Sequence, residues 1–322
     1  MFWSFEALDL FSLKCILQTD NYSQRLINMK NTIIIILITL PFHLFGQTPD
    51  DTLGIKLFNR GLEFYKKGNL DSTLIIWTKI VDNKMGIHSD VYGNAFFNIP
   101  TIYWQIKNYD KAKDWYRKIL ASDLKDNDET GSLMEPHTNY KHKAAVALAG
   151  LYQLDSNYTE VLQWLEKADT LYRYWGFEGS ASNVSKRQAY LLAWKAEVLQ
   201  NLNKPEEAIR LIITELICSD KLENFFKASE DILIKLVDKT PFKSKFDNAI
   251  NQLEIKKLGD GNWVASFSLD RLAYNIPISN VYPNRNLPHY WTIYFIDKNS
   301  IPDKQNIINY IQNRNFYKRL IK

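Results

Sequence analysis

The sequence predicts a mainly α-helical protein, in which a solenoid of helical hairpins is followed by a small α+β module with an antiparallel sheet. Apolar residues recur at helical spacing in paired segments between Asp51 and Ile217, and short polar turns separate the members of each pair. After Leu253 the pattern changes to alternating strands around an Asp-Gly turn. With 322 residues, 46% of them hydrophobic and 24% charged, the chain has the composition of a globular protein rather than a disordered one.

Two segments precede the part that is expected to fold. Met29 and Lys30 are followed by an apolar run from Thr32 to Phe45 and by the small residue Gly46, which is the layout of a signal peptide. We therefore expect residues 1–28 to be an upstream start-site extension and residues 29–46 a signal peptide, so that the mature protein is secreted or periplasmic in the cell envelope. The run is shorter than the roughly 20 apolar residues of a membrane span, so no stable span is expected after cleavage. The alternative is that Ile33–Phe45 stays as an inner-membrane anchor.

The segment Asn108–Leu120 shows why a repeated hairpin is expected. Its spacing places Tyr109, Ala112, Tyr116 and Ile119 on one helical face, and a matching apolar stripe precedes it. One hairpin cannot bury such a face by itself, so the pattern predicts copies of the same unit. The second helices of these copies are predicted to start at Leu70, Tyr109, Tyr158 and Pro205.

Four successive copies carry bulky, small and aromatic residues at corresponding positions: Leu57, Gly61, Phe64, Thr73, Trp77 and Ile80; Phe96, Ile99, Tyr103, Tyr109, Ala112, Tyr116 and Ile119; Leu148, Tyr152, Tyr158, Val161, Leu165 and Ala168; Leu192, Ala196, Ala208, Ile209 and Ile212. These positions resemble those of tetratricopeptide repeats over residues 51–217, within a predicted repeat domain of residues 47–238. The second-helix starts lie 39, 49 and 47 residues apart, whereas the family period is about 34. Pro100 falls where the family prefers Gly, so we expect that helix to be kinked or to start late.

The resemblance implies a non-enzymatic scaffold protein, which binds a peptide or protein on the concave side formed by the first helices. First-helix residues away from the packing stripe would line that side, and the candidate peptide-binding residues are Phe58, Tyr65, Asn94, Phe97, Trp104, Arg187, Tyr190 and Trp194. One alternative is that the C-terminal region folds back over these side chains. Another is a cell-envelope glycan- or substrate-binding protein, in which the Trp and Tyr rings stack on sugars.

Residues 239–322 are predicted to form a separate basic α+β module. They carry 13 Lys or Arg and 6 Asp or Glu, whereas residues 47–238 carry 24 and 27. Alternation and turn residues predict strands at Leu253–Leu258, Trp263–Leu269, Leu272–Ile278 and Tyr290–Ile296, with Pro277 weakening the end of the third. A helix is predicted over Ser300–Asn313, with Pro302 near its first position.

Basic side chains in this module are candidates for contact with an acidic partner. The candidate contact residues are Lys256, Lys257, Arg314, Lys318 and Arg319. That partner would be the acidic inserts of the repeats, an anionic lipid surface or an acidic protein. Nucleic acid is not expected, because the chain carries no nucleic-acid fold signature.

Catalytic, cofactor and metal motifs do not stand out in this sequence. His137 and His142 lie five residues apart, which is poor helical spacing for a metal site, and Cys218 has no His close in sequence to activate it. We therefore predict no catalytic residue, no cofactor and no metal. The enzyme alternative would require a pocket in the C-terminal module with convergent polar residues around His289, Asp270 or Arg271.

Overall fold

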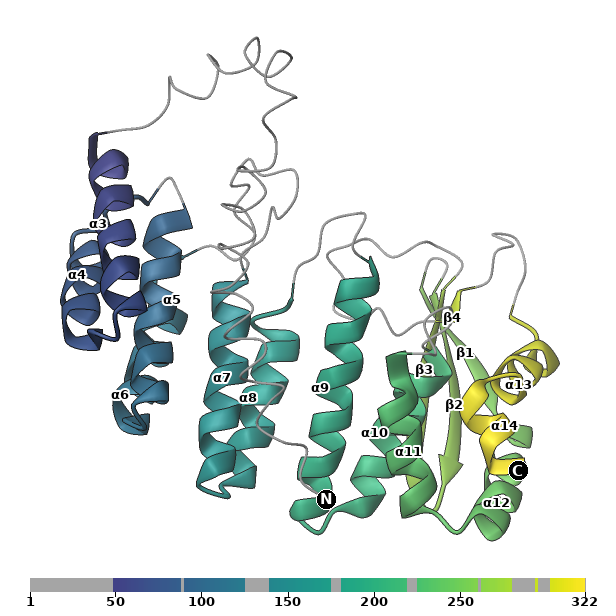
Figure 1. Cartoon of the computed structure of the whole chain (residues 1–322). Helices are drawn as coiled ribbons and strands as arrows, with labels where there is room; N and C mark the ends of the chain where they lie inside the picture. Colours follow the sequence, from purple (N-terminus) through teal and green to yellow (C-terminus); the bar gives the residue numbers. More distant parts are fainter. Residues whose placement is uncertain are drawn as a thin grey trace, which may run out of the picture. The chain divides into compact units, whose positions relative to one another are not determined.

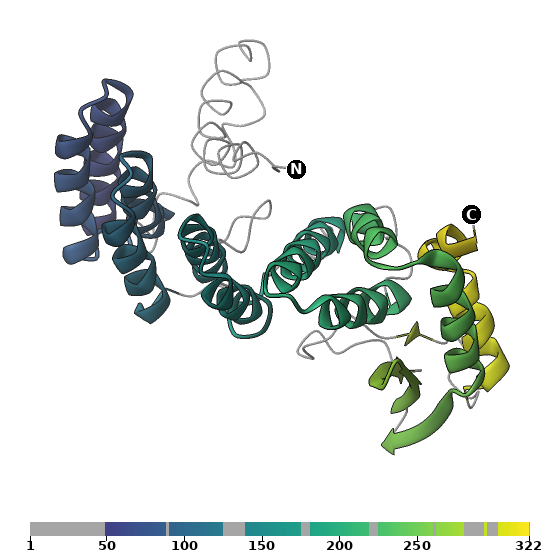
Figure 2. The same ribbon diagram turned by 90° about the horizontal axis from the view of Figure 1, so that it is seen from below.

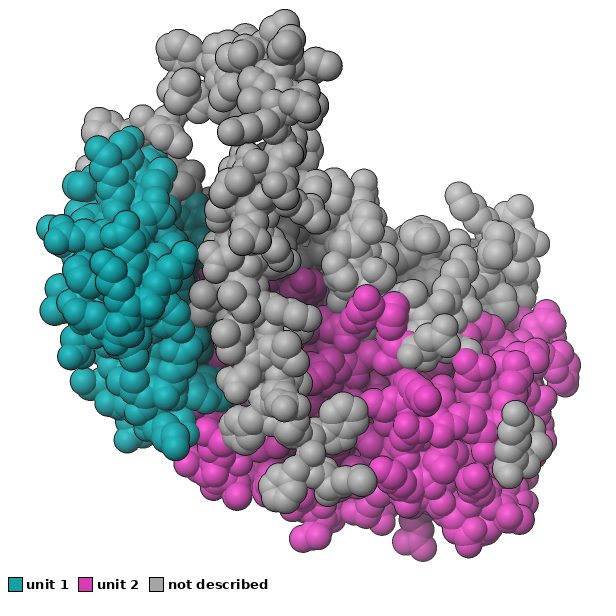
Figure 3. Space-filling view, in the orientation of Figure 1, with its two compact units in different colours: residues 1–122 teal, residues 123–322 magenta. Residues whose placement is uncertain are grey.

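The computed structural model describes residues 49–87, 90–124, 139–174, 181–218, 225–259, 262–279, 293–294 and 302–321. The predicted upstream extension and signal peptide lie outside this part of the chain. Among the helices of the described residues, none is both long and apolar enough to cross a bilayer. The chain divides into two compact units, residues 1–122 and 123–322, which Figure 3 shows in teal and magenta.

The first unit contains two helical hairpins. Helices α3 (Pro49–Lys66) and α4 (Leu70–Asp82) form one, and α5 (Asp90–Gln105) and α6 (Tyr109–Ala121) form the other. The four helices lie side by side when viewed from below in Figure 2, with α4 packed on α5 and α3 also in contact with α5. Pro100 lies inside α5, which begins at Asp90, so the predicted late start is wrong. Ile99, Pro100 and Ile102 are all buried, so this part of α5 faces the core of the first unit.

The second unit starts with two more hairpins (Figure 1), which are α7 (Tyr140–Leu154) with α8 (Tyr158–Thr170) and α9 (Ala181–Asn201) with α10 (Pro205–Cys218). Helices α11 (Lys227–Leu236) and α12 (Lys239–Asn251) follow, and α11 packs on α9 and α10. All four predicted second-helix starts are confirmed, at Leu70, Tyr109, Tyr158 and Pro205. The fold class is therefore the predicted one, a tetratricopeptide-like array of helical hairpins with a small C-terminal sheet.

The four predicted hairpins share one turn geometry. In each, a residue with left-handed backbone closes the first helix, and these residues are Gly68 (φ 75°), Lys107 (φ 60°), Ser156 (φ 54°) and Asn203 (φ 57°). The next residue donates its backbone N–H to the carbonyl five residues earlier, as from Asn108 to Tyr103 over 2.8 Å. This is the Schellman ending of a helix. In three turns that next residue is an Asn whose side chain also caps the second helix: Asn69, Asn108 and Asn157.

A sheet with strand order β1-β2-β3-β4 follows α12. Strands β1 (Glu254–Gly259), β2 (Asn262–Leu269) and β3 (Leu272–Ser279) are antiparallel, as predicted. Pro277 pairs with Val264 inside β3, so it does not end the strand. The predicted fourth strand is described only at β4 (Ile293–Tyr294), which runs parallel to β3.

Two short helices, α13 (Lys304–Gln312) and α14 (Asn315–Ile321), complete the chain. Helix α13 starts later than predicted, because Asp303 is its N-cap and accepts the N–H of Asn306 at 3.1 Å. Pro302 therefore lies before the helix rather than in its first turn.

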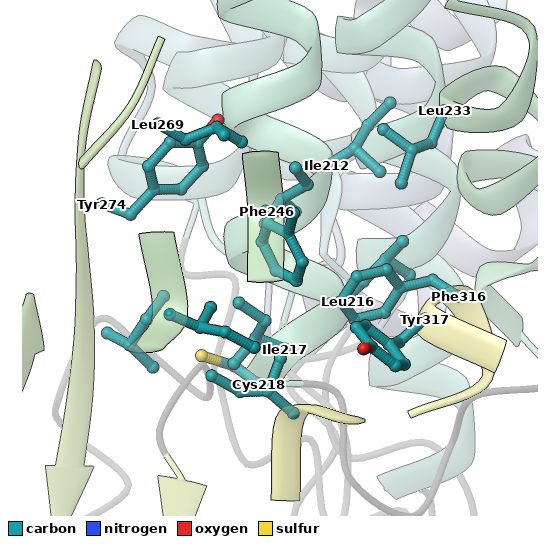
Figure 4. Packing of buried hydrophobic residues seen from close by; sticks show 14 of the residues in the cluster. Ile212, Leu216, Ile217, Cys218, Leu233, Phe246, Leu269, Tyr274, Phe316 and Tyr317 are labelled. Carbon is teal, nitrogen blue, oxygen red and sulfur yellow. The ribbon is translucent and has the colours of Figure 1, made fainter. Parts of the chain in front are cut away.

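One apolar core joins α9 through α12, the inner face of β2 and β3, and α13 and α14. Figure 4 shows Ile212 and Leu216 of α10 near Phe246 of α12 and Phe316 of α14. Residues on both sides of position 238 thus share this core. The boundary predicted at 238/239, like the other predicted domain limits, stays a prediction.

Candidate functional site

The first helices of the first unit carry a row of partly exposed aromatic side chains. Phe58 and Tyr65 of α3 stack on Trp77 of α4, with ring centroids 5.5 and 6.2 Å apart, and Trp77 itself is only 1% exposed. Phe97 of α5 lies 5.8 Å from buried Tyr116 of α6 in the same way. Each of these three surface rings is therefore held from behind by a buried ring of the second helix.

A polar pair links the two first helices across this row. Gln105 Nε2 donates to the Tyr65 hydroxyl over 2.8 Å, and this hydroxyl lies 3.1 Å from Gln105 Oε1. We call Phe58, Tyr65, Asn94, Phe97, Trp104 and Gln105 the α3/α5 surface. Gln105 was not predicted, because a single polar residue at a helix end gives no sequence signal. Asn94, Phe97 and Trp104 are all partly exposed.

The predicted residues of the second unit lie along one face of α9. The Arg187 guanidinium lies 5.6 Å from the centre of the Tyr190 ring, and that ring lies 5.7 Å from Trp194. Tyr190 is 40% exposed, but Trp194 is only 8% exposed and its indole N–H donates to Gln153 Oε1 of α7. Trp194 is therefore mainly a core residue, which differs from the predicted exposed indole. The physical reason is tertiary, since α9 turns this side chain toward α7.

The Arg187 side chain also makes a hydrogen bond within the protein. Its Nε donates to His142 Nε2 over 2.8 Å, so the ring proton of His142 is on Nδ1. That atom lies 2.8 Å from the Tyr172 carbonyl and 3.0 Å from the Ala168 carbonyl. Burial, reinforced by the charge of Arg187, lowers the pKa of His142 to about 3. Neutral His142 thus joins α7, the end of α8 and α9.

The five basic residues that were predicted to contact an acidic partner differ in how far they are exposed to solvent. Arg314 is buried beside the Tyr310 ring, and Arg319 forms ion pairs with Glu230 at 2.9 Å and Asp231 at 2.6 Å. The acidic partner of Arg319 is thus α11 of the same chain. Of the five, Lys256, Lys257 and Lys318 are exposed.

An open groove that was not predicted lies on the α5–α6 hairpin. Lysine ammonium groups lie over its two aromatic rings, Lys111 at 5.3 Å from Tyr103 and Lys118 at 4.3 Å from Trp115. Lys111, Trp115 and Lys118 are four and three residues apart and therefore lie on one face of α6. This spacing is visible in the sequence, although the groove was not predicted from it.

Three features of the described residues bear on catalytic and metal chemistry. Within them there is no cluster of three or more side chains able to hold a metal ion. Burial, helped by Glu215, raises the pKa of the Cys218 thiol, which disfavours the thiolate that a nucleophile requires. Asp270 and Arg271 form the β2–β3 turn, where Asp270 pairs with Lys245 at 2.9 Å. His289 and His137 lie outside the described residues.

No protein-family model and no curated protein sequence matches this chain. Among solved structures, the chain is similar to nearly identical TPR-like repeats of a Podosopora anserina protein described as a putative kinesin light chain. The identity is 13%, the TM-score is 0.40, and the match covers 59% of this chain and 87% of that one. A variant of the same protein matches at 12% identity with the same TM-score and coverage. A structural similarity with so low a TM-score does not support the fold class, which rests on the turns and the helix packing of this chain.

Proposed function

We propose that this protein is a helical-repeat interaction protein, which binds an extended segment of a partner protein on the α3/α5 surface. The observation that supports this proposal is the row of partly exposed rings that buried rings hold in place. Such rings lose little conformational freedom when a ligand covers them, so more of the contact energy appears as affinity.

The polar groups of the same surface complement those of a peptide. An extended peptide carries a donor and an acceptor at nearly every residue. The Tyr65 hydroxyl and the Gln105 amide offer both kinds of group beside the aromatic rings. Apolar side chains of the peptide would cover the rings, while its backbone would bond to this pair.

Peptide selection with matched variants tests the proposed site. Peptides selected from a displayed library on the wild-type protein should bind Tyr65→Ala and Trp104→Ala at least about tenfold more weakly, as expected for the loss of aromatic contacts. Ile75→Ala is the control, because Ile75 is 71% exposed and lies on the second helix α4. Circular dichroism would check that each variant is folded. If Tyr65→Ala, Trp104→Ala and the control bind the peptides equally well, the peptide-binding site lies elsewhere. If a polysaccharide quenches the tryptophan fluorescence of the protein and the peptides do not, a glycan-binding function is favoured.

We also propose that the protein works outside the cytoplasm, on the signal-like layout of Met29 to Gly46. The test is the N-terminal mass of the protein recovered from its host, fraction by fraction. A chain that starts at Gln47 in the periplasmic or secreted fraction is the expected result. An intact N-terminus in the cytosol would contradict it, and one in the membrane fraction would favour an anchor.

A further inference from the structure

Strand β1 lies at one end of the sheet, and β2 is its neighbour there. Among the described strands, the strand order places β2 on one side of Glu254–Gly259 and none on the other. Within the described part of the chain, no further hydrogen bond is made by the backbone of residues 254–258. An edge strand of this kind presents a row of free donors and acceptors to a segment that pairs with it.

The side chains of β1 show that this edge is held in place but open to solvent. Ile255 packs against the apolar core, and it anchors the strand. Lys256, Lys257 and Leu258 are exposed, and Leu258 is among the most exposed large apolar residues described, at 69%. The edge therefore combines an open backbone with two positive charges and one apolar side chain.

The two lysines lie on opposite faces of the sheet, since Lys256 pairs with Val264 and Lys257 with Trp263. Neither charge is neutralised strongly by the described residues. Glu254 lies 3.4 Å from the Lys256 ammonium, but both side chains are well exposed and such a pair is weak. The Lys257 ammonium lies 5.8 Å from the Trp263 ring centre.

We propose that β1 is a docking edge for an extended acidic segment of a partner protein, which adds a strand to the sheet and places consecutive carboxylates opposite Lys256 and Lys257. Backbone pairing supplies affinity in this mode, and the cross-strand charges supply selectivity. Lysines at an edge repel basic strands and so restrict which segments pair there.

A second copy of the chain is a poor occupant of this edge in the register that sets the two lysines against each other. Antiparallel pairing of two β1 strands, centred between the lysines, would place Lys256 of one copy opposite Lys257 of the other. Like charges directly opposite one another destabilise a strand pair. The charges therefore favour a different, acidic chain.

The test uses the full chain and short capped peptides. The probe is fluorescent Thr-Val-Glu-Glu-Val-Thr, and its comparison peptides carry Lys-Lys in place of Glu-Glu or N-methyl groups on the backbone. We expect the acidic peptide to bind at least about tenfold more tightly than both comparison peptides, as for charge-selected strand pairing. It should also slow amide hydrogen exchange in residues 254–259, which a contact through charge alone would not do.

Matched variants separate this edge from general electrostatics. Lys256→Glu with Lys257→Glu should reverse the preference toward the Lys-Lys peptide. Lys304→Glu with Lys318→Glu changes the net charge equally at exposed sites and should leave the preference intact. Tyr65→Ala and Trp104→Ala should also bind normally, so failure here and failure of the α3/α5 site are distinguishable. Equal binding of acidic and N-methylated peptides, unchanged exchange, or a peptide-free dimer paired through β1 would overturn the proposal.

Discussion

His142 is a residue at which polar chemistry fixes the packing of three helices. Its Nδ1–H points to carbonyls at the end of α8, and its Nε2 accepts from Arg187 of α9. The ring must stay neutral in this position, because both burial and Arg187 oppose a second proton. We therefore predict that His142 couples the stability of the folded protein to pH.

The sign of this coupling follows from the lowered pKa. The unfolded chain takes up a proton at this ring below its ordinary pKa of 6.5, whereas the folded chain does so only near pH 3. The contribution is thus complete above about pH 6.5, and it falls as the pH drops toward 3, by about 2 kcal/mol at pH 5. The difference in unfolding free energy between wild type and His142→Gln, measured with denaturant, should shrink by that amount from about pH 8 to about pH 5. A difference that stays constant with pH would show that the ring is not kept neutral.

At the scale of elements, the repeated turn predicts a stabilising substitution. Lys107 adopts the left-handed backbone that Gly68 adopts in the first turn. A side chain at this conformation costs about 1 kcal/mol or more relative to Gly, although Gly loses more entropy on folding. Lys107→Gly should therefore raise the unfolding free energy by about 0.5 kcal/mol. Gly68→Ala is the reverse substitution at the equivalent position of the first turn, and it should lower the unfolding free energy because φ is 75° there. A loss of stability in Lys107→Gly would contradict this account of the turn.

The same turns explain why helix starts were predictable. Asn69, Asn108 and Asn157 each cap the helix that follows, and a local signal of this kind is visible in the sequence alone. The start of α13 was missed because two local signals compete at its beginning. Pro302 is a typical first residue, but the carboxylate of Asp303 takes the capping position.

Side-chain exposure was less predictable, because it depends on distant residues. Phe58 and Tyr65 are partly exposed, and the Trp77 ring behind them comes from another helix. Trp194 was expected on the surface, yet Gln153 binds its indole from 41 positions away. The charge pattern likewise identified Arg319 but not its ion pair with α11.

At the scale of the whole molecule, the division into two compact units predicts two separate unfolding transitions. Residues 1–122 form one unit and residues 123–322 the other. In arrays of repeats, stability is carried mainly by neighbouring elements. A substitution in the core of one unit should therefore lower one transition and leave the other in place.

Two substitutions make this prediction measurable by calorimetry. In Gly61→Ala, the added methyl group would overlap the indole nitrogen of Trp77, and this overpacking should cost about 1–3 kcal/mol in the first unit. In Phe316→Ala, loss of a fully buried ring on α14 should cost about 3–5 kcal/mol in the second. Lys318→Ala, an exposed change on the same helix, should alter neither transition. If both core variants shift a single common transition, the two units unfold together and the division at residue 122 is not a boundary of cooperativity. If the transitions separate, we expect Phe316→Ala to shift only the second one, because Phe316 lies in the core that α9 to α12 share with the sheet.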